Sequence, residues 1–275
     1  MLRASRNSTL RSMSALLPQR SVARMVDREM FLLLGGTTAL LMQVAHPLVA
    51  AGVDQHSDFR RDPVGRLRRT LDTTLAVVFG DDRAVRAAIA RMNRIHHGVH
   101  GKSERGQAYR ARDPRLLLWV QTTLVLTSLR FYELVMGPLS PAEREAYWSE
   151  AKPIAAALGI PDDALPATLA DLERWEREML AGEVRPDATA KRVARDVLRP
   201  FRWLPDPAYW PSDAIAAALL PPRIRADLGL RYGPAERTLF HAMVVAVRWL
   251  RRGLPAMLTV VPQARRYERA SLAQG

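Results

Sequence analysis

The sequence contains no cysteine. That absence excludes disulfide bonds, iron–sulfur clusters and any prosthetic group attached through a thiolate or a thioether. A metal or cofactor in this protein must therefore be held by other side chains, and histidine is the commonest of these ligands. The chain has six histidines, so the search for a site begins with them.

Lysine is almost as scarce, with only Lys102, Lys152 and Lys191, although the formal net charge is +13. Arginine supplies nearly all of the positive charge. A balance this basic favours nucleic acid or an anionic membrane as a partner. However, the arginines are spread over the whole chain, and no patch shows interleaved aromatic residues or a known reading motif. We expect no nucleic-acid partner and a cytoplasmic location, and peripheral contact with a membrane stays open.

Alternation of apolar and polar residues, the mark of a half-buried strand, is missing too, as are internal repeats and long linkers. Ala, Leu and Arg are abundant, which favours helices. At 275 residues the chain is long enough for one large hydrophobic core. We predict an all-α fold with a single domain over residues 27–275. A basic, partly ordered leader of residues 1–26, with five arginines and no acid, would precede it.

Fixed charge is missing from residues 30–53, a stretch long enough in principle to cross a bilayer. Gly35-Gly36, Gln43 and the pair His46-Pro47 interrupt this stretch. Proline removes a backbone donor and disfavours helix in the residue before it. We therefore predict two buried helices that meet at His46-Pro47 rather than one transmembrane span.

What the chain does have is a concentration of histidine in its first half, where five of the six lie. His96 and His100 are four residues apart on a predicted helix that extends to Gly101, so they would share a face while His97 points elsewhere. One of the two could ligate haem iron through a ring nitrogen. Alternatively, both could bind a non-haem metal, with Glu104 or an acid from another segment as the third ligand. Histidines that only pack and form hydrogen bonds are the third interpretation.

Four motifs in this half carry a family resemblance. They are LLLGGTTALLMQVAHPLVAAGV, HSDFRRDPVGRLRRT, RIHHGVHG and DPRLLLWVQTTL, in that order. This succession resembles the MpaB-type oxygenase family, which includes rubber oxygenase, over about half of the chain. The resemblance implies an all-helical, globin-like domain built around a buried haem pocket, with a b-type haem held through one histidine. It also implies that dioxygen is used on an apolar, unsaturated substrate.

The resemblance assigns roles to individual residues. His96 matches the family's proximal haem ligand and would be the metal ligand, while His100 stands where the family usually has arginine, so the choice between them stays open. Arg66, Arg69 and Thr70 match a pattern that lies over the haem in rubber oxygenase, and they are the candidate catalytic residues. Arg69 stands where a lysine can occupy the distal position on iron. Because arginine does not deprotonate readily, it is a poor iron ligand.

His46, His56 and Thr123 match a His-Pro pair, a His-Ser pair and a helical threonine of the family. The resemblance therefore places them at the cofactor together with His96 and His100. From the residues alone, a buried His46 that caps a broken helix is an equally good account, and Thr123 would bond back to a carbonyl one turn earlier. The glutamate that rubber oxygenase uses as a base has no counterpart that we can place, because the corresponding run is uncharged.

We predict from these features a haem b-dependent oxygenase that acts with dioxygen on a small, apolar, unsaturated substrate, with isoprenoids as one class that fits. Two alternatives stay open. One is a non-catalytic haem-binding or haem-sensing protein, which the missing glutamate favours. The other is a basic helical protein that associates with a membrane or with nucleic acid and holds no metal.

Overall fold

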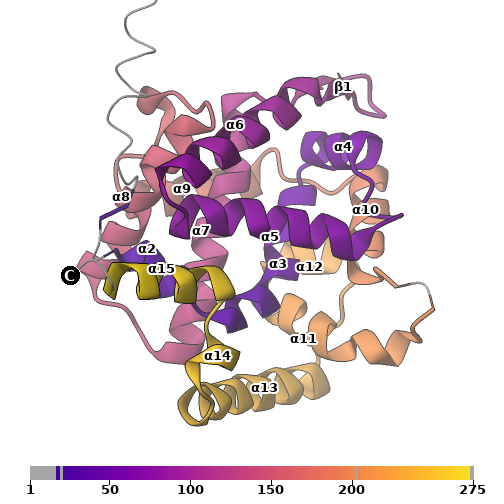
Figure 1. Ribbon diagram of the computed structural model, residues 1–275. Coiled ribbons are helices and arrows are strands. Elements are labelled where there is room, and N and C mark those ends of the chain that lie inside the picture. The colour runs from indigo at the N-terminus through magenta and orange to yellow at the C-terminus, as the bar shows by residue number, and fades with distance from the viewer. Residues whose placement is uncertain (1–16, 19–20, 202, 273–275) are drawn as a thin grey trace, which may run out of the picture.

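The computed structural model describes residues 17–18, 21–201 and 203–272, and residues 1–16 and 19–20 of the predicted leader lie outside this part (Figure 1). The described chain is mostly helical, which confirms the predicted helical class. The first half comprises α2 (Val22–Asp27), η1 (Met30–Gly35), α3 (Gly36–Val44), α4 (Pro47–His56), α5 (Pro63–Phe79), α6 (Asp82–Gly98), β1 (His100–Lys102), β2 (Ala108–Arg110) and α7 (Pro114–Met136). The second half comprises α8 (Pro141–Ala157), η2 (Asp162–Ala164), α9 (Leu169–Ala181), α10 (Ala188–Leu198), η3 (Asp206–Tyr209), α11 (Trp210–Leu219), α12 (Pro222–Asp227), α13 (Pro234–Gly253), α14 (Ala256–Thr259) and α15 (Pro262–Leu272).

Helix α7 is the centre of the core. Its first turn is set by Pro114 and by Asp113, whose side chain accepts a hydrogen bond from the backbone of Arg115 at 2.8 Å. Thirteen of its 23 residues are buried. The chain packs η1, α3, α8, α9 and α13 against it. Trp119, fully buried, ties α7 to α3 because its indole N–H lies 3.2 Å from the carbonyl of Met42.

The predicted break at His46-Pro47 is confirmed. Helix α3 ends before it and α4 begins at Pro47, with a bend of 108° between the segments Met30–Val44 and Pro47–His56. The His46 ring caps the new helix, because its Nδ1 accepts a hydrogen bond from the backbone of Leu48 at 3.2 Å. No single helix among the described residues has the length and apolar character to cross a membrane, and this bent pair meets those criteria by length and composition only.

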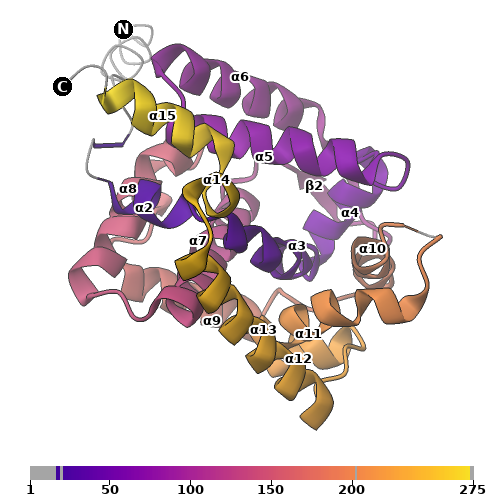
Figure 2. The same cartoon turned by 60° about the horizontal axis from the view of Figure 1, so that its bottom comes forward.

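Helices α5 and α6 form an antiparallel hairpin, visible side by side in both views (Figures 1 and 2). Asp62 caps α5, Gly80 ends it, and Asp81 caps α6. Helix α6 ends at Gly98, three residues before the predicted end. The chain then forms the antiparallel pair β1–β2, in which His100 lies opposite Arg110. Glycine has poor helix propensity, and Val99 here has the extended backbone that begins the turn into β1.

The second half of the chain wraps around the first. Helix α8 starts with a reciprocal capping box formed by Ser140 and Glu143. Helix α10 packs against α3 and α4, and α11 packs against α13. The short helix η3 lies between α10 and α11. Helix α15 returns to lie along α5, so both ends of the described chain meet on one side (Figure 2).

Glu29 links these ends. Its carboxylate is 3% exposed and accepts two hydrogen bonds from Arg251 on α13, one of them 2.9 Å long. The backbone of Glu29 pairs with Val260, and the carbonyl of Arg28 accepts a hydrogen bond from Val261 at 2.9 Å. The residue before η1 is therefore fixed to the segment after α13 by both side chain and backbone.

Arg251→Met should destabilise the protein by about 3 kcal/mol, because it removes both hydrogen bonds from Arg251 to the buried Glu29 carboxylate and leaves the Arg28 guanidinium 4.0 Å away. The matched control is Arg252→Met, which changes an exposed neighbour on the same helix. Urea denaturation followed by circular dichroism measures both. Equal midpoints for the two variants would contradict a stabilising role for the ion pair.

Asp27 is the second unusual acid of this region. Its carboxylate accepts a hydrogen bond from the Tyr147 hydroxyl on α8 at 2.8 Å. Burial raises the pKa of Asp27 to about 7, and the nearby Glu150 carboxylate adds to the rise, while the Tyr147 hydrogen bond opposes it. Glu150 is held in place because it accepts hydrogen bonds from the Ser21 hydroxyl at 2.6 Å and the Ala23 backbone at 2.8 Å, at the start of α2.

Asp27→Asn should therefore alter how stability depends on pH. The folded protein holds a proton at Asp27 that the unfolded chain releases above about pH 4. That contribution to stability is complete at lower pH and is lost as the pH rises to about 7. The melting temperature of the wild type should fall relative to that of the variant across this range, with the exposed Asp163→Asn as control. Parallel pH curves for wild type and Asp27→Asn would refute this account.

Candidate active site

His96 lies in the last turn of α6 with a half-buried ring. Its Nδ1 atom is buried and has no hydrogen-bond partner among the described residues. Burial lowers the pKa of the His96 imidazole, and the positive charges of Arg112 and Arg66 lower it further. The ring is thus held neutral, the form in which a histidine nitrogen can donate its lone pair to a metal. A side chain added at Gly98, two residues on, would meet no atom within 4 Å, so open space lies beside this turn.

Arg66 on α5 is the half-buried cation that acts on this ring. Its Nη1 donates a hydrogen bond to Thr70 Oγ1, and its Nε lies 3.4 Å from Ser57 Oγ. Within the described part of the chain it forms no ion pair with a carboxylate, although Asp58 exerts a weaker attraction from a distance. Burial lowers the pKa of Arg66, which reflects the cost of removing its charge from water. A guanidinium in this position is suited to an anionic ligand.

Arg69, the third candidate catalytic residue, has charged partners of its own. It is 42% exposed and forms ion pairs with Asp62 at 3.0 Å and Asp58 at 3.2 Å. These acids precede α5 and draw the Arg69 side chain back towards the helix start. The structure therefore brings Arg66, Thr70 and His96 into one neighbourhood and holds Arg69 in surface ion pairs.

The expected shared face of His96 and His100 is not formed, because His100 belongs to β1 and its side chain is exposed. The backbone carbonyl of His100 lies 3.1 Å from Nε2 of His56, whose ring packs edge-on against Tyr109. These contacts attach the end of α4 to the β1–β2 hairpin. In this structure His56 and His100 hold two elements together.

His46 is buried at the other end of α4 from His56, where it acts as the helix cap. Its Nε2 stands 3.5 Å from Glu183 Oε2 without forming a hydrogen bond. Burial lowers the pKa of His46, and the nearby Glu183 carboxylate opposes that change. The capping role that the residues alone suggested is therefore what the structure shows.

Thr123 is fully buried in α7, and its hydroxyl donates a hydrogen bond to the carbonyl of Val120 at 2.8 Å. The residue beside it was not singled out from the sequence. Leu124 is 38% exposed, and Leu40 on the neighbouring α3 is 37% exposed, although both helices are otherwise core elements. A side chain added at Gly36, one turn before Leu40, would also meet nothing within 4 Å. Apolar side chains of two central helices thus face open space.

Arg112 was not among the residues predicted for the site. It follows β2, so its charge acts on His96 only because the chain forms the β1–β2 hairpin, which the sequence did not predict. The only available signal was its position between the histidine cluster and the start of α7. Leu40 and Leu124 gave no signal, since they lie in runs where almost every residue is apolar.

The alternative of a non-haem metal held by His96, His100 and Glu104 gains no support. No group of three His, Asp or Glu side chains in the described part of the chain is arranged to hold a metal ion. Glu104 instead pairs with Arg192 at 3.1 Å. A single histidine with a free nitrogen is compatible with a cofactor that brings the remaining ligands itself.

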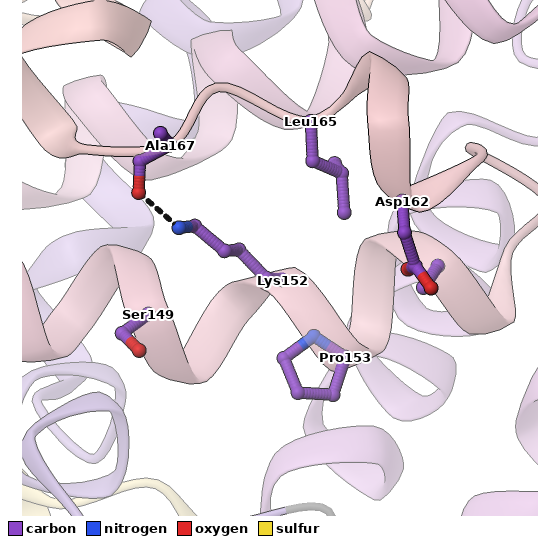
Figure 3. A pocket seen from close by; sticks show the side chains of 7 residues that line it. Ser149, Lys152, Pro153, Asp162, Leu165 and Ala167 are labelled. Carbon is purple, nitrogen blue, oxygen red and sulfur yellow. Dashed lines mark hydrogen bonds between the residues drawn. The ribbon is translucent and has the colours of Figure 1, made fainter.

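A cavity of about 540 Å³ opens elsewhere, against the outer side of α8 (Figure 3). Its lining residues are Ser149, Lys152, Pro153, Ala156, Asp162, Leu165 and Ala167. The Lys152 ammonium donates a hydrogen bond to the carbonyl of Ala167, as Figure 3 shows. None of the residues expected at the site lines this cavity.

Comparison with known proteins identifies relatives and a family for this chain. The chain is 27% identical over 229 residues to the uncharacterized protein Mb2261 of Mycobacterium bovis and to the uncharacterized protein Rv2237 of Mycobacterium tuberculosis. Each match covers 78% of this chain and 87% of the relative. No solved structure matches the chain. The family described as ER-bound oxygenase mpaB/B′/rubber oxygenase, catalytic domain, matches residues 23–249, and the chain belongs to that family of oxygenase catalytic domains.

Proposed function

We propose that the protein is a haem b-dependent oxygenase that acts with dioxygen on a small, apolar, unsaturated substrate. The observation that carries the proposal is the buried Nδ1 of His96, which has no partner and belongs to a ring held neutral by burial and by two arginines. A buried polar atom without a hydrogen bond is costly, so the atom is explained best as a ligand position. Membership of an oxygenase family supports the reaction class.

The residues around His96 fit the other demands of a haem. Haem propionates are anionic, and Arg66 has no carboxylate partner in the described chain while Arg112 adds a second positive charge. His96 would hold the iron, and Arg66 and Arg112 would hold the propionate carboxylates. The bound haem would supply the iron at which dioxygen is activated.

The apolar substrate requires a surface of its own. Leu40 and Leu124 offer one, because they expose apolar area from the two central helices α3 and α7. Contact with these side chains would select a lipophilic molecule and exclude water from the space around it. Thr70 is less available for chemistry, since its hydroxyl donates to the carbonyl of Arg66 at 2.9 Å and accepts from the Arg66 guanidinium.

A second candidate function is a haem-binding or haem-sensing protein without catalysis. Residues 30–53, where we looked for a counterpart of the family's catalytic glutamate, contain no acidic residue. The two functions share the haem site and differ in turnover. Consumption of dioxygen in the presence of an olefin by the haem-loaded protein separates them.

His96→Ala should abolish haem binding. Wild-type protein incubated with haemin should show a sharp Soret band, because the His96 nitrogen supplies an axial ligand. His97→Ala is the matched control, since the adjacent ring is exposed and on the same helix. Absorption spectra and a haem titration measure the difference. A wild type that binds no haem, or a Soret band that survives in His96→Ala, would overturn the proposal.

Arg66→Met should weaken haem binding by about ten- to a hundredfold, since a charge-assisted hydrogen bond to a carboxylate contributes about 1.5–3 kcal/mol. Methionine keeps much of the apolar stem while removing the charge. The control is Arg68→Met, because Arg68 is 82% exposed on the same helix and pairs only with Asp72. The haem dissociation constant is the readout. Similar constants for both variants would mean that Arg66 does not contact the propionates.

The haem complex should persist below pH 6.5, which is about the ordinary pKa of histidine. An exposed imidazole would already be protonated at such a pH. The reason is that burial and the two arginines lower the pKa of His96. A titration of the Soret band from neutral to acid pH measures the midpoint. Loss of haem at the ordinary histidine value would contradict a buried, neutral ligand.

A further inference from the structure

Helix α13 has one buried face and one exposed apolar face. Phe240 and Val244 pack into the core. On the other side, Val245 is 49% exposed, Trp249 is 69% exposed and Leu250 is 54% exposed. Residues four apart share a helix face, so Val245 and Trp249 form one stripe directed away from the core. Figures 1 and 2 both show α13 at an edge of the molecule.

The exposed apolar surface continues beyond the end of α13. Leu254 is 37% exposed in the turn, and Met257 and Leu258 on the short α14 are 64% and 53% exposed. Helix α14 contacts η1, where Leu33 and Leu34 are also more than 40% exposed. We call the residues Val245, Trp249, Leu250, Leu254, Met257 and Leu258 the α13–α14 surface. Monomeric proteins rarely expose so many large apolar side chains together, and such patches mark interaction sites.

The charged residues of the chain segment that forms this surface have one sign. Residues 237–267 contain no aspartate or glutamate. They contain six arginines, which are Arg237, Arg248, Arg251, Arg252, Arg265 and Arg266. A hollow of about 290 Å³ beside the surface is lined by Val135, Met136, Arg248, Arg251 and Arg252.

The three arginines of this hollow differ in their hydrogen-bond and ion-pair partners. Arg251 is bound to Glu29, and Arg248 donates to the carbonyl of Leu134. Arg252 is exposed and has no partner among the described residues. At least one guanidinium is thus free to meet an anion at the rim of an apolar patch.

We propose that the α13–α14 surface docks on an anionic lipid bilayer, with the apolar side chains entering the headgroup–acyl boundary and Arg252 meeting a lipid phosphate. An apolar face that contains Trp and is rimmed by arginine is the pattern of an interfacial membrane-binding element, and each cation near an anionic surface adds to the attraction. A second copy of the chain fits less well. A two-fold contact through this surface would bring positive charges together without an acid to offset them.

The proposal is independent of haem, and its test uses full-length protein and lipid vesicles. The vesicles are phosphatidylcholine alone or phosphatidylcholine mixed with phosphatidylserine. Wild-type protein should float with the mixed vesicles and much less with the neutral ones. Binding should weaken as salt is raised, because salt screens the arginine–phosphate attraction.

Trp249→Ala should reduce the partition onto mixed vesicles by about tenfold or more, because a large apolar side chain no longer enters the bilayer. Trp203→Ala is the matched control, since Trp203 is 79% exposed in the segment between α10 and η3. Arg252→Glu should reduce binding at low salt. Because these side chains are exposed, the variants should keep the wild-type melting temperature, which circular dichroism checks.

Three results would overturn the proposal. The first is wild-type protein that does not float with either kind of vesicle. The second is an equal loss of binding in Trp203→Ala and Trp249→Ala. The third is a dimer in sedimentation analysis that Trp249→Ala dissociates, because it would assign this surface to a second copy of the chain.

Discussion

The burial of α7 on most of its sides is the constraint on which the rest of the structure depends. A helix can be enclosed in this way because its backbone groups are paired internally, and α7 keeps Thr122 inside by bonding the hydroxyl to the carbonyl of Leu118 at 2.7 Å. The helices that pack against α7 must then present apolar faces to it. For this reason η1 and α3 contain no charged residue, and α13 buries the apolar side chains of one face. The α6–β1–β2 segment connects α5 to Asp113 at the start of α7. This connection determines where His96 lies relative to α5.

Local chemistry determined the features that the sequence could predict. The break at His46-Pro47, the caps at Asp62, Asp81, Asp113 and Ser140, and the end of α5 at Gly80 each depend on a residue and its near neighbours. A proline or a capping side chain acts within one turn of helix, so its effect can be predicted without knowledge of the fold. The family resemblance was predicted on the same basis, from four short motifs, and the family match confirms it.

The features that escaped prediction depend on contacts between distant segments. The end of α6 is fixed partly by β2 and the residue after it, because Ala111 donates to the carbonyl of Val99 at 2.9 Å. Nothing in the sequence distinguishes Arg66 from Arg69, since both are arginines in the first turns of α5. In the structure the acids before α5 form ion pairs with Arg69 and leave Arg66 without a carboxylate partner. Leu40 and Leu124 are exposed because the other helices do not cover them. The sequence of an apolar segment does not reveal which of its residues stay uncovered. The assignment of a haem and of a substrate stays a proposal.

The combination of His96 and Arg66 is hard to explain by folding alone. Burial of a guanidinium without a carboxylate partner costs free energy, and so does burial of an imidazole nitrogen without a hydrogen bond. The two groups do not relieve one another, since the Arg66 guanidinium donates to Ser57 and Thr70 and the Nδ1 atom of His96 has no partner among the described residues. Local departures of this kind concentrate at functional sites, where a ligand compensates for them. An anionic group that carries its own metal would satisfy both residues at once, because its charge would pair with Arg66 while its metal accepted the lone pair of His96. A ligand with only one of these properties would leave the other residue unsatisfied.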